Sequence, residues 1–154
     1  MKIYVMRHGP AEDEAASGKD GDRVLTPSGR DRVRLAAREL IQRGKTPHAV
    51  LSSPLARARQ TADILIQEAG LGADALELRN ELAMTDHVAT LVNEVVAAKR
   101  KRVVLVGHEP ELSSLVFELT GTSLIMQKAM IVAISFKADG RTVLKFVIDP
   151  KLVP

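Results

Sequence analysis

The sequence contains no cysteine, no tryptophan and few other aromatic residues. The absence of cysteine excludes disulfides, thiolate nucleophiles and metal sites built from cysteine. Aromatic residues make up only 3% of the 154 residues, so the core must be built from aliphatic side chains. Scarce aromatics also argue against a platform on which the bases of single-stranded nucleic acid would stack.

Long apolar segments are also missing. No apolar run is long enough to span a bilayer, and the amino terminus lacks the long apolar segment that signal peptides carry. We therefore expect a cytoplasmic protein with no membrane contact.

Neither sign of charge dominates, because a net charge of +3 is spread over interspersed acidic and basic residues. This mild basic excess favours anionic ligands but does not require DNA or RNA. The densest basic run, residues 99–102, ends a predicted helix, where it complements the negative end of the helix dipole. We expect no nucleic-acid partner.

The chain has the length of a single domain with one sizeable core, and 45% of its residues are hydrophobic. We expect residues 1–154 to form that one domain. Strand-like and helix-like segments alternate almost throughout, which predicts a three-layer α/β/α fold with a mostly parallel sheet. Strand-like segments at 129–136 and 142–148 flank a turn at Asp139-Gly140 and predict a C-terminal antiparallel hairpin at one edge of the sheet.

Proline and glycine mark the ends of the predicted helices. Thr26-Pro27 and Ser53-Pro54 each place a capping side chain before a proline, which is typical of a helix start. Gly44 and Gly70 follow apolar stripes and are typical helix stops. The polar stretch at 10–25 predicts a long mobile loop. The other predicted elements are strands at 2–6, 49–52, 76–79 and 103–106, a helix at 86–98, and a helix after Pro110 that carries Leu112, Leu115, Val116 and Leu119.

Polar residues stand where three of the predicted strands end. Arg7-His8-Gly9 follows the first strand, Arg57 lies in the first turn of the helix after the second, and His108 follows the valine-rich strand. Ligands of open α/β sheets bind beyond the carboxyl ends of the strands. Two arginines and two histidines are therefore expected to converge at one edge of the sheet.

This set of side chains suits a phosphoryl group. The guanidinium of Arg7 can hold phosphate oxygens through its planar fork of donors, and His8 can then act as the nucleophile and form a covalent phosphohistidine. Gly9 lets the backbone turn and leaves room for a bulky anion. Because attack requires an unprotonated ring nitrogen, we expect a backbone carbonyl to bind the other ring N–H of His8 and fix its tautomer.

Other charged residues are less specific. Residues two apart on a helix do not share a face, so we assign Arg57 to the site and Arg59 to the solvent. Arg23 is either a residue of the pocket mouth or an ordinary loop charge. His48 precedes a strand and is expected at the surface, whereas His87, in the first turn of a helix, is ambiguous.

Four motifs, in this order along the chain, make the sequence recognisable. They are Met6-Arg7-His8-Gly9, the segment 22–29, the segment 52–62, and Val106-Gly107-His108-Glu109-Pro110. Together they resemble the histidine phosphatase superfamily, the phosphoglycerate-mutase-like group. The short length and the last motif are most similar to bacterial SixA-type protein-histidine phosphatases.

The resemblance implies a role for each matched residue. It makes His8 the phosphorylated nucleophile, Arg7 and Arg57 phosphate ligands, and His108 the second histidine of the pocket. Two guanidiniums and a histidine donor around the equatorial oxygens agree with the needs of phosphoryl transfer. The implied activity is removal of phosphate from phosphohistidine through a covalent phosphohistidine intermediate, without a metal or other cofactor. Gly9 completes the expected substrate-binding set, with Arg23 as a further candidate.

The expected partner is a phosphohistidine-bearing protein, such as a carrier of a two-component phosphorelay, and the role is signal transduction. Phosphate or sulfate is the expected pocket anion. We expect the loop at 10–25 and the basic residues 99–102 to contact the partner, and we expect a monomer.

The general acid is the weakest part of the match. Members that cleave phosphoesters carry a glutamate acid in a clear local motif, which this sequence lacks. Glu81 and Asp86 are candidates, although Asp86 also suits a helix N-cap, and the loop acids at 12–14 are others. An alkoxide leaving group needs a positioned acid, worth about 10²–10⁴-fold, whereas the ring of a phosphohistidine can already be protonated. The hypothesis is therefore a phosphohistidine substrate.

Three alternatives remain open. A small-molecule phosphomonoesterase would use the same pocket with Glu81, Asp86 or a loop carboxylate as its acid. A catalytically inactive phosphoprotein-binding module would keep the pocket without turnover. A metal site on His8 and His108 would need carboxylates from loops, since no close ligand spacing occurs.

Overall fold

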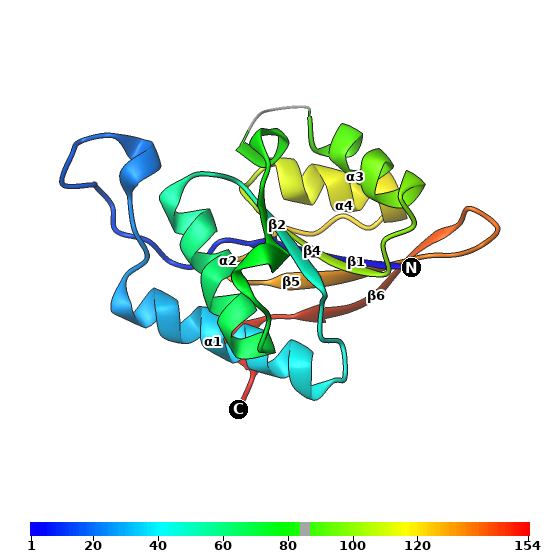
Figure 1. The fold of residues 1–154 in the computed structure, drawn as a ribbon, viewed down its shortest axis with the longest axis horizontal. Helices are drawn as coiled ribbons and strands as arrows, with labels where there is room; N and C mark the ends of the chain where they lie inside the picture. Colours follow the sequence, from blue (N-terminus) through cyan, green and yellow to red (C-terminus); the bar gives the residue numbers. More distant parts are fainter. Residues whose placement is uncertain (84–86) are drawn as a thin grey trace.

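The computed structural model describes residues 1–83 and 87–154, whose strands form one six-stranded sheet in the order β3-β2-β4-β1-β5-β6 (Figure 1). The strands are β1 (Lys2–Arg7), β2 (Ala49–Ser52), β3 (Leu76–Leu78), β4 (Arg102–Gly107), β5 (Ile131–Phe136) and β6 (Thr142–Ile148). The helices are α1 (Pro27–Gln42), α2 (Ala56–Ala69), α3 (Val88–Ala97) and α4 (Glu111–Thr120), and short 3₁₀ helices include η1 (Asp20–Asp22) and η3 (Asn80–Ala83).

Strands β3, β2, β4 and β1 run parallel, whereas β5 is antiparallel to β1 and β6 is antiparallel to β5. The valine-rich run of β4 lies between β2 and β1 and is buried on both faces, as central parallel strands are. The hairpin of β5 and β6 forms one edge. The predicted mostly parallel sheet with a C-terminal antiparallel hairpin is confirmed.

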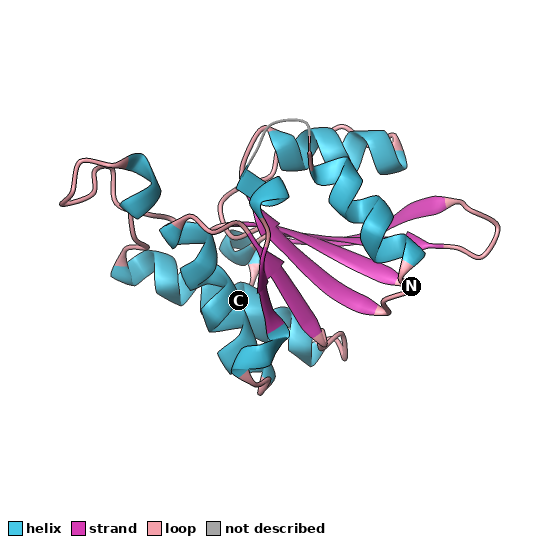
Figure 2. Ribbon diagram, turned by 45° about the horizontal axis from the view of Figure 1, so that its top comes forward, coloured by secondary structure: helices cyan, strands magenta, loops and turns pink. Residues whose placement is uncertain are grey.

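Helices cover both faces of the sheet (Figure 2). Because successive strand residues point to opposite faces, Tyr4 and Met6 of β1 pack with Leu40 of α1 and with α2 on one face. Ile3 and Val5 pack with α3 and α4 on the other. The molecule therefore has the three α/β/α layers predicted from the alternation of elements.

The boundaries of α1 follow its sequence signals. Thr26 Oγ1 accepts a hydrogen bond from the Gly29 N–H at 3.0 Å, Pro27 occupies the first helical position, and Gly44 adopts a φ of 73° just beyond the last turn. A left-handed φ of this kind is strained for residues other than glycine. This helix was correctly predicted at both ends.

The predicted start of α2 at Ser53-Pro54 is wrong. The helix begins at Ala56, with Leu55 as an N-cap that makes no side-chain capping bond. The hydroxyl of Ser53 lies 2.8 Å from Nε2 of His108, so the side chain that suits a cap contacts the ring of another segment instead. The predicted stop is confirmed, because Gly70 has a φ of 70°.

Other predicted elements differ slightly in length, and β5 starts at Ile131, two residues later than predicted. The third strand ends at Leu78, one residue earlier than predicted, and α3 runs from Val88 to Ala97. The predicted start of that helix at Asp86 lies outside the described residues. Within residues 1–83 and 87–154, no helix combines the length and the apolar character needed to cross a bilayer.

The polar stretch at 11–25, called the 11–25 loop below, projects beyond the helices at the left of Figure 1. Both of its ends are anchored. Ala11 and Leu25 form an antiparallel bridge, and the Leu25 N–H donates to Oε1 of Gln60 in α2 at 2.8 Å. Between these anchors, η1 packs against the start of α2. The loop therefore brings η1 next to the carboxyl edge of the sheet.

Candidate active site

The residues that follow β1, β4 and β2 meet at the carboxyl edge of the sheet. The His8 N–H donates to the Gly107 carbonyl at 3.1 Å, and the Ser53 N–H donates to the Val106 carbonyl at 3.0 Å. The rings of His8 and His108 lie 5.2 Å apart between centroids. The convergence predicted from the strand ends is therefore confirmed.

The His8 ring is fixed in one tautomer. Its Nδ1 lies 2.8 Å from the Gly9 carbonyl oxygen. Because a carbonyl can only accept, Nδ1 carries the proton and Nε2 keeps a free lone pair. Burial lowers the pKa of His8 to about 3; the Gly9 hydrogen bond opposes this shift, and the neighbouring His108, Arg57 and Arg7 add to it. The expected carbonyl contact is confirmed, and Nε2 is unprotonated at neutral pH.

Acid is expected to destabilise the protein through His8. Its folded pKa of about 3 lies below the ordinary value of about 6.5, so on acidification the unfolded chain takes up a proton that the folded protein does not bind. The resulting stability is complete above about pH 6.5 and is lost as the pH falls, by up to about 1.4 kcal/mol per pH unit. Urea unfolding measured from about pH 7 to pH 4 should show a shallower loss for His8→Asn. Identical slopes would contradict the assignment.

Gly9 is required by packing. A Cβ at Gly9 would lie 2.5 Å from Cγ2 of Val33 and 3.2 Å from the Gly29 carbonyl oxygen, both in α1. The Gly9 N–H also donates to Oγ1 of Thr61 at 3.0 Å. The sequence suggested that Gly9 leaves room for an anion. The space where its Cβ would lie is instead filled by α1.

Gly9→Ala is expected to lower the free energy of unfolding by about 1–3 kcal/mol, since overpacking of this kind displaces backbone. Urea denaturation measures the loss. The double variant Gly9→Ala/Val33→Ala is the control, because it removes the clashing methyl groups. Its loss should be smaller than the sum of the two single losses, and strict additivity would show that the clash is not the cause.

Arg57 enters the site from the first turn of α2, whereas Arg59 is exposed. Only 7% of Arg57 is accessible to solvent. One turn later, the Thr61 hydroxyl accepts from Gly9 and donates to the Arg57 carbonyl at 2.8 Å. This double contact fixes α2 relative to the segment that carries His8, and it confirms the predicted orientations of the two arginines.

Arg7 is oriented by a chain of hydrogen bonds that starts in the fourth motif. Its Nη1 donates to the Met126 carbonyl at 3.0 Å, and the Met126 N–H donates to Oγ of Ser113 at 3.0 Å. Ser113 in turn donates to the Glu109 carboxylate through both its N–H and its hydroxyl. Burial lowers the pKa of Arg7, and the charge of Glu109 opposes that shift. Glu109 thus supports Arg7 through two intermediates.

His108 is held through Ser53. Its Nε2 lies 2.8 Å from Oγ of Ser53, and that hydroxyl also accepts from the Leu55 N–H at 3.2 Å. Burial lowers the pKa of His108 to about 4; the charge of Arg57 adds to this shift, whereas that of Asp20 opposes it. The ring is therefore neutral at neutral pH. If the hydroxyl donates to Nε2, the single ring proton is on Nδ1.

Unpartnered nitrogens gather at this edge of the sheet. In the described part of the chain, the buried polar side-chain atoms without a hydrogen-bond partner are the Tyr4 hydroxyl, Nε of Arg7, Nε of Arg57 and Nδ1 of His108. An unsatisfied buried group costs about 1–3 kcal/mol, so a cluster of three such nitrogens beside His8 requires an explanation. The two cations are suited to bind an oxyanion, and Nδ1 of His108 adds a neutral donor in the tautomer in which Ser53 donates to Nε2.

Asp20, which sequence reasoning missed, also belongs to the site. Its carboxylate Oδ2 lies 3.2 Å from Nη2 of Arg57, and its Oδ1 lies 3.0 Å from Nε of Arg23. Arg23 also donates to the Glu12 carbonyl at 3.1 Å. These contacts favour a position of Arg23 at the mouth of the pocket over an ordinary loop charge. No sequence signal singled out Asp20, because it is one of five acidic residues between positions 12 and 22.

The predicted acid candidates lie in different surroundings. Glu81 forms an ion pair with Arg79 at 2.6 Å, and Arg79 also binds Glu94. Glu12 accepts from the Val24 N–H, while the neighbouring acids at 13–14 are exposed. Asp86 lies outside the described residues. No described contact brings a predicted acid to the two histidines, so that part of the site stays a prediction.

The other two histidines are exposed. His48 accepts from the Arg102 N–H where β4 starts, at the end of the sheet opposite His8. The basic residues 99–102 reach the same end, which separates them from the site. His87 precedes α3 without a side-chain capping bond. Among residues 1–83 and 87–154, no group of three or more histidine and acidic side chains is placed to hold a metal ion.

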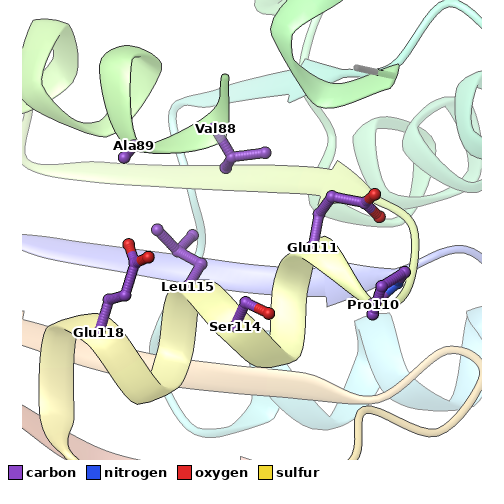
Figure 3. A pocket seen from close by; sticks show the side chains of 7 residues that line it. All are labelled: Val88, Ala89, Pro110, Glu111, Ser114, Leu115 and Glu118. Atoms are coloured by element: carbon purple, nitrogen blue, oxygen red, sulfur yellow. The ribbon is translucent and has the colours of Figure 1, made fainter. Parts of the chain in front are cut away.

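A separate open groove of about 230 Å³ lies between α3 and α4 (Figure 3). Val88 and Leu115 form its apolar part, and Glu111 and Glu118 lie along α4. Pro110 links it to the segment that carries His108. Among the described residues, neither a histidine nor an arginine lines the groove, which distinguishes it from the oxyanion site.

Known proteins share both the sequence pattern and the fold. The model of the histidine phosphatase superfamily, branch 1, matches residues 3–88. The chain is 35% identical to the phosphohistidine phosphatase SixA of Escherichia coli over 126 residues, which cover 77% of this chain and 74% of that protein. It is 37% identical over 139 residues to an uncharacterized protein of Picosynechococcus sp., covering 87% of this chain and 84% of that protein.

A solved structure extends this similarity over almost the whole chain. The protein histidine phosphatase SixA complexed with tungstate superposes with a TM-score of 0.87 at 27% identity, covering 98% of both chains. Tungstate is a tetrahedral oxyanion, the class of ligand that the three unpartnered nitrogens suit. The chain therefore belongs to the histidine phosphatase superfamily, in its SixA-type group, and is a phosphatase whose catalysis depends on histidine.

Proposed function

We propose that the protein removes the phosphoryl group from phosphohistidine on another protein, with His8 as the nucleophile. The observation that carries the proposal is the cluster of unpartnered nitrogens on Arg7, Arg57 and His108 around the neutral ring of His8. These nitrogens would hold the oxygens of the phosphoryl group while the free lone pair of His8 faces phosphorus. The similarity to SixA-type proteins supports the same reading.

The first step transfers the phosphoryl group to the protein. The bond between phosphorus and the substrate nitrogen breaks, and its electron pair stays with the departing ring. A new bond forms between phosphorus and Nε2 of His8, whose other nitrogen donates to the Gly9 carbonyl. The ring of His8 becomes positively charged, and the carbonyl of Gly9 stabilises that charge through the shared proton. Arg7 and Arg57 neutralise the equatorial oxygens throughout.

The second step restores the protein. A water oxygen attacks phosphorus, the bond to His8 breaks, and the electron pair returns to Nε2. Inorganic phosphate leaves, and the proton lost by water passes to solvent or to phosphate. With its proton on Nδ1, His108 would donate to a phosphoryl oxygen in both steps, and Ser53 would keep that tautomer.

A nitrogen leaving group is favoured because the carboxylates described near the site are paired with arginines and offer no proton to a leaving oxygen. Glu81 is paired with Arg79, and Asp20 is paired with Arg57 and Arg23. An alkoxide would depart without the proton that it needs, whereas the protonated ring of a phosphohistidine departs as neutral imidazole. The partner would be a phosphohistidine carrier, and the 11–25 loop, which contacts Arg57 through Asp20, is the surface that the carrier would contact.

The second candidate function is hydrolysis of small phosphomonoesters in the same pocket. The family model is compatible with it, because that match does not distinguish one leaving group from another. It would require a carboxylate to reach the leaving oxygen, and Asp86, outside the described residues, is the remaining candidate of that stretch.

The test is turnover of a histidine-phosphorylated carrier protein beside that of a phosphoserine peptide and a sugar phosphate. Phosphate release and covalent labelling of His8 are followed together, with and without EDTA. We expect preferential release from the carrier, a transient acid-labile label on His8, and full activity in EDTA. Equal turnover of the carrier and the esters would reject the phosphohistidine preference, and loss of activity in EDTA would restore the metal alternative.

A further inference from the structure

Asp20 is the charged residue of the 11–25 loop that contacts Arg57, a proposed phosphate ligand. Both terminal nitrogens of Arg57 bind it: Nη1 donates to the Asp20 carbonyl at 3.1 Å, and Nη2 donates to the carboxylate at 3.2 Å. Arg23 binds the other carboxylate oxygen at 3.0 Å. Asp20 is thus held by side-chain hydrogen bonds from two arginines.

This contact leaves the phosphate-binding edge of Arg57 free. A guanidinium offers five N–H donors along two usable edges. Asp20 occupies the edge formed by Nη1 and Nη2, while Nε is buried and unpartnered. The edge formed by Nε and the second hydrogen of Nη2 can therefore bind two phosphoryl oxygens without displacing Asp20. The carboxylate and the substrate can occupy the site together.

Asp20 lies on the solvent side of the site. Its side chain is 69% exposed, whereas that of Arg57 is 9% exposed. The carboxylate is close enough to influence His108, whose pKa it raises against the larger effect of burial. Arg57, and after it Arg23, holds the pKa of Asp20 below its ordinary value, so the group is an anion at neutral pH.

In-line transfer places the leaving group opposite the nucleophile. Because His8 is buried whereas the side chain of Asp20 is exposed, a leaving group opposite His8 would depart towards the solvent, on the side of Asp20. A phosphohistidine is reactive when its ring is cationic, because breaking the P–N bond then releases neutral imidazole. A phosphoester releases an oxygen that gains negative charge. A fixed carboxylate stabilises the cationic imidazole ring of the phosphohistidine and repels the negative oxygen of the phosphoester.

We propose that Asp20 is a specificity residue, which favours phosphoryl transfer from a cationic imidazole over transfer from an oxygen leaving group. The inference rests on the proposed phosphohistidine activity and explains how that preference arises without a general acid. It assigns the preference to a charge at the mouth of the site and not to the residues that hold the phosphoryl group.

The test compares Asp20→Asn with the wild type on two probes, a histidine-phosphorylated carrier protein and p-nitrophenyl phosphate. Asparagine keeps an oxygen that can accept from Arg57 but removes the charge. We expect kcat/KM on the carrier to fall by about tenfold, as for the loss of one nearby charge at a partly exposed site, with kcat affected more than KM. On p-nitrophenyl phosphate it should stay unchanged or rise.

Two variants complete the design. Asp22→Asn removes a charge from the same short helix η1, where the carboxylate accepts from the Ser17 hydroxyl. It should leave the rate on p-nitrophenyl phosphate and kcat on the carrier unchanged, and any effect of the loop on carrier docking should appear in KM alone. Asp20→Glu keeps the charge and should keep the preference. Inhibition by inorganic phosphate should remain in all variants, which shows that the anion site is intact.

The outcomes separate this inference from the proposed function. Equal losses of Asp20→Asn on both probes would mean that Asp20 only positions Arg57, and unchanged rates would mean that its charge has no effect; either overturns the inference. If the wild type itself shows no preference for the carrier, the proposed function fails first.

Discussion

Replacing His8 by alanine is expected to abolish turnover, with kcat lower by about 10⁵- to 10⁶-fold, the size of effect seen when a covalent nucleophile is removed. The reason is that Nε2 of His8 carries the free lone pair that attacks phosphorus. The other ring nitrogen of His8, Nδ1, is bound to the Gly9 carbonyl, and Nε2 of His108 contacts Ser53. Single-turnover phosphate release and the loss of the covalent label measure the effect.

The same variant should keep much of its affinity for inorganic phosphate or tungstate. The unpartnered nitrogens belong to Arg7, Arg57 and His108, and all three remain in His8→Ala. Isothermal titration measures the binding. His48→Ala is the matched control, because this histidine is exposed at the opposite end of the sheet, and it should retain full activity. Turnover by His8→Ala near the wild-type rate would exclude His8 as the nucleophile.

The sequence predicted the parts of the site that depend on regular structure. Arg7, His8 and His108 follow strands whose apolar runs are clear, and parallel strands bring their carboxyl ends to one edge. Helical periodicity was enough to separate Arg57 from Arg59, because residues two apart cannot face the same way. These interpretations needed only the alternation of strands and helices.

The parts that were missed depend on contacts between segments far apart in the sequence. Ser53 has the local pattern of a helix cap, yet its hydroxyl binds the ring of His108, 55 residues later, and α2 starts only at Ala56. Asp20 is one acid among several in a loop without periodicity. Only the folded loop brings it into contact with Arg57, which lies 37 residues later in the sequence. Propensity rules carry no information on such pairings.

Gly9 shows the same limit in a different form. Glycine at a strand end suggested a turn beside an anion, and the residue does lie next to His8. Its actual constraint comes from Val33 of α1, which fills the space that a Cβ would occupy. Position in the sequence was enough to find the residue, but only packing across the sheet explains it.

Arg57→Ala is the second change with a large expected effect, a fall in kcat/KM of about 10³- to 10⁵-fold, comparable to the loss of an arginine that stabilises phosphoryl transfer in other enzymes. Arg57 is almost fully buried, and its Nε has no protein partner. Its charge enters the site from α2 and influences the rings of both His8 and His108. Without it, Arg7 alone of the two arginines would bind the phosphoryl oxygens, and Asp20 would keep only Arg23 as its partner.

Arg59→Ala provides the matched control, since it removes the same side chain from the same helix two residues later, where it is exposed. Both variants are compared on the phosphorylated carrier and in phosphate binding, with urea unfolding to confirm that each is folded. Arg57→Lys tests the geometry: it keeps the charge but cannot offer one edge to Asp20 and another to the phosphoryl group, so it should recover only a small part of the loss. Equal losses for Arg57→Ala and Arg59→Ala would show that general positive charge, and not the buried fork of Arg57, supports the reaction.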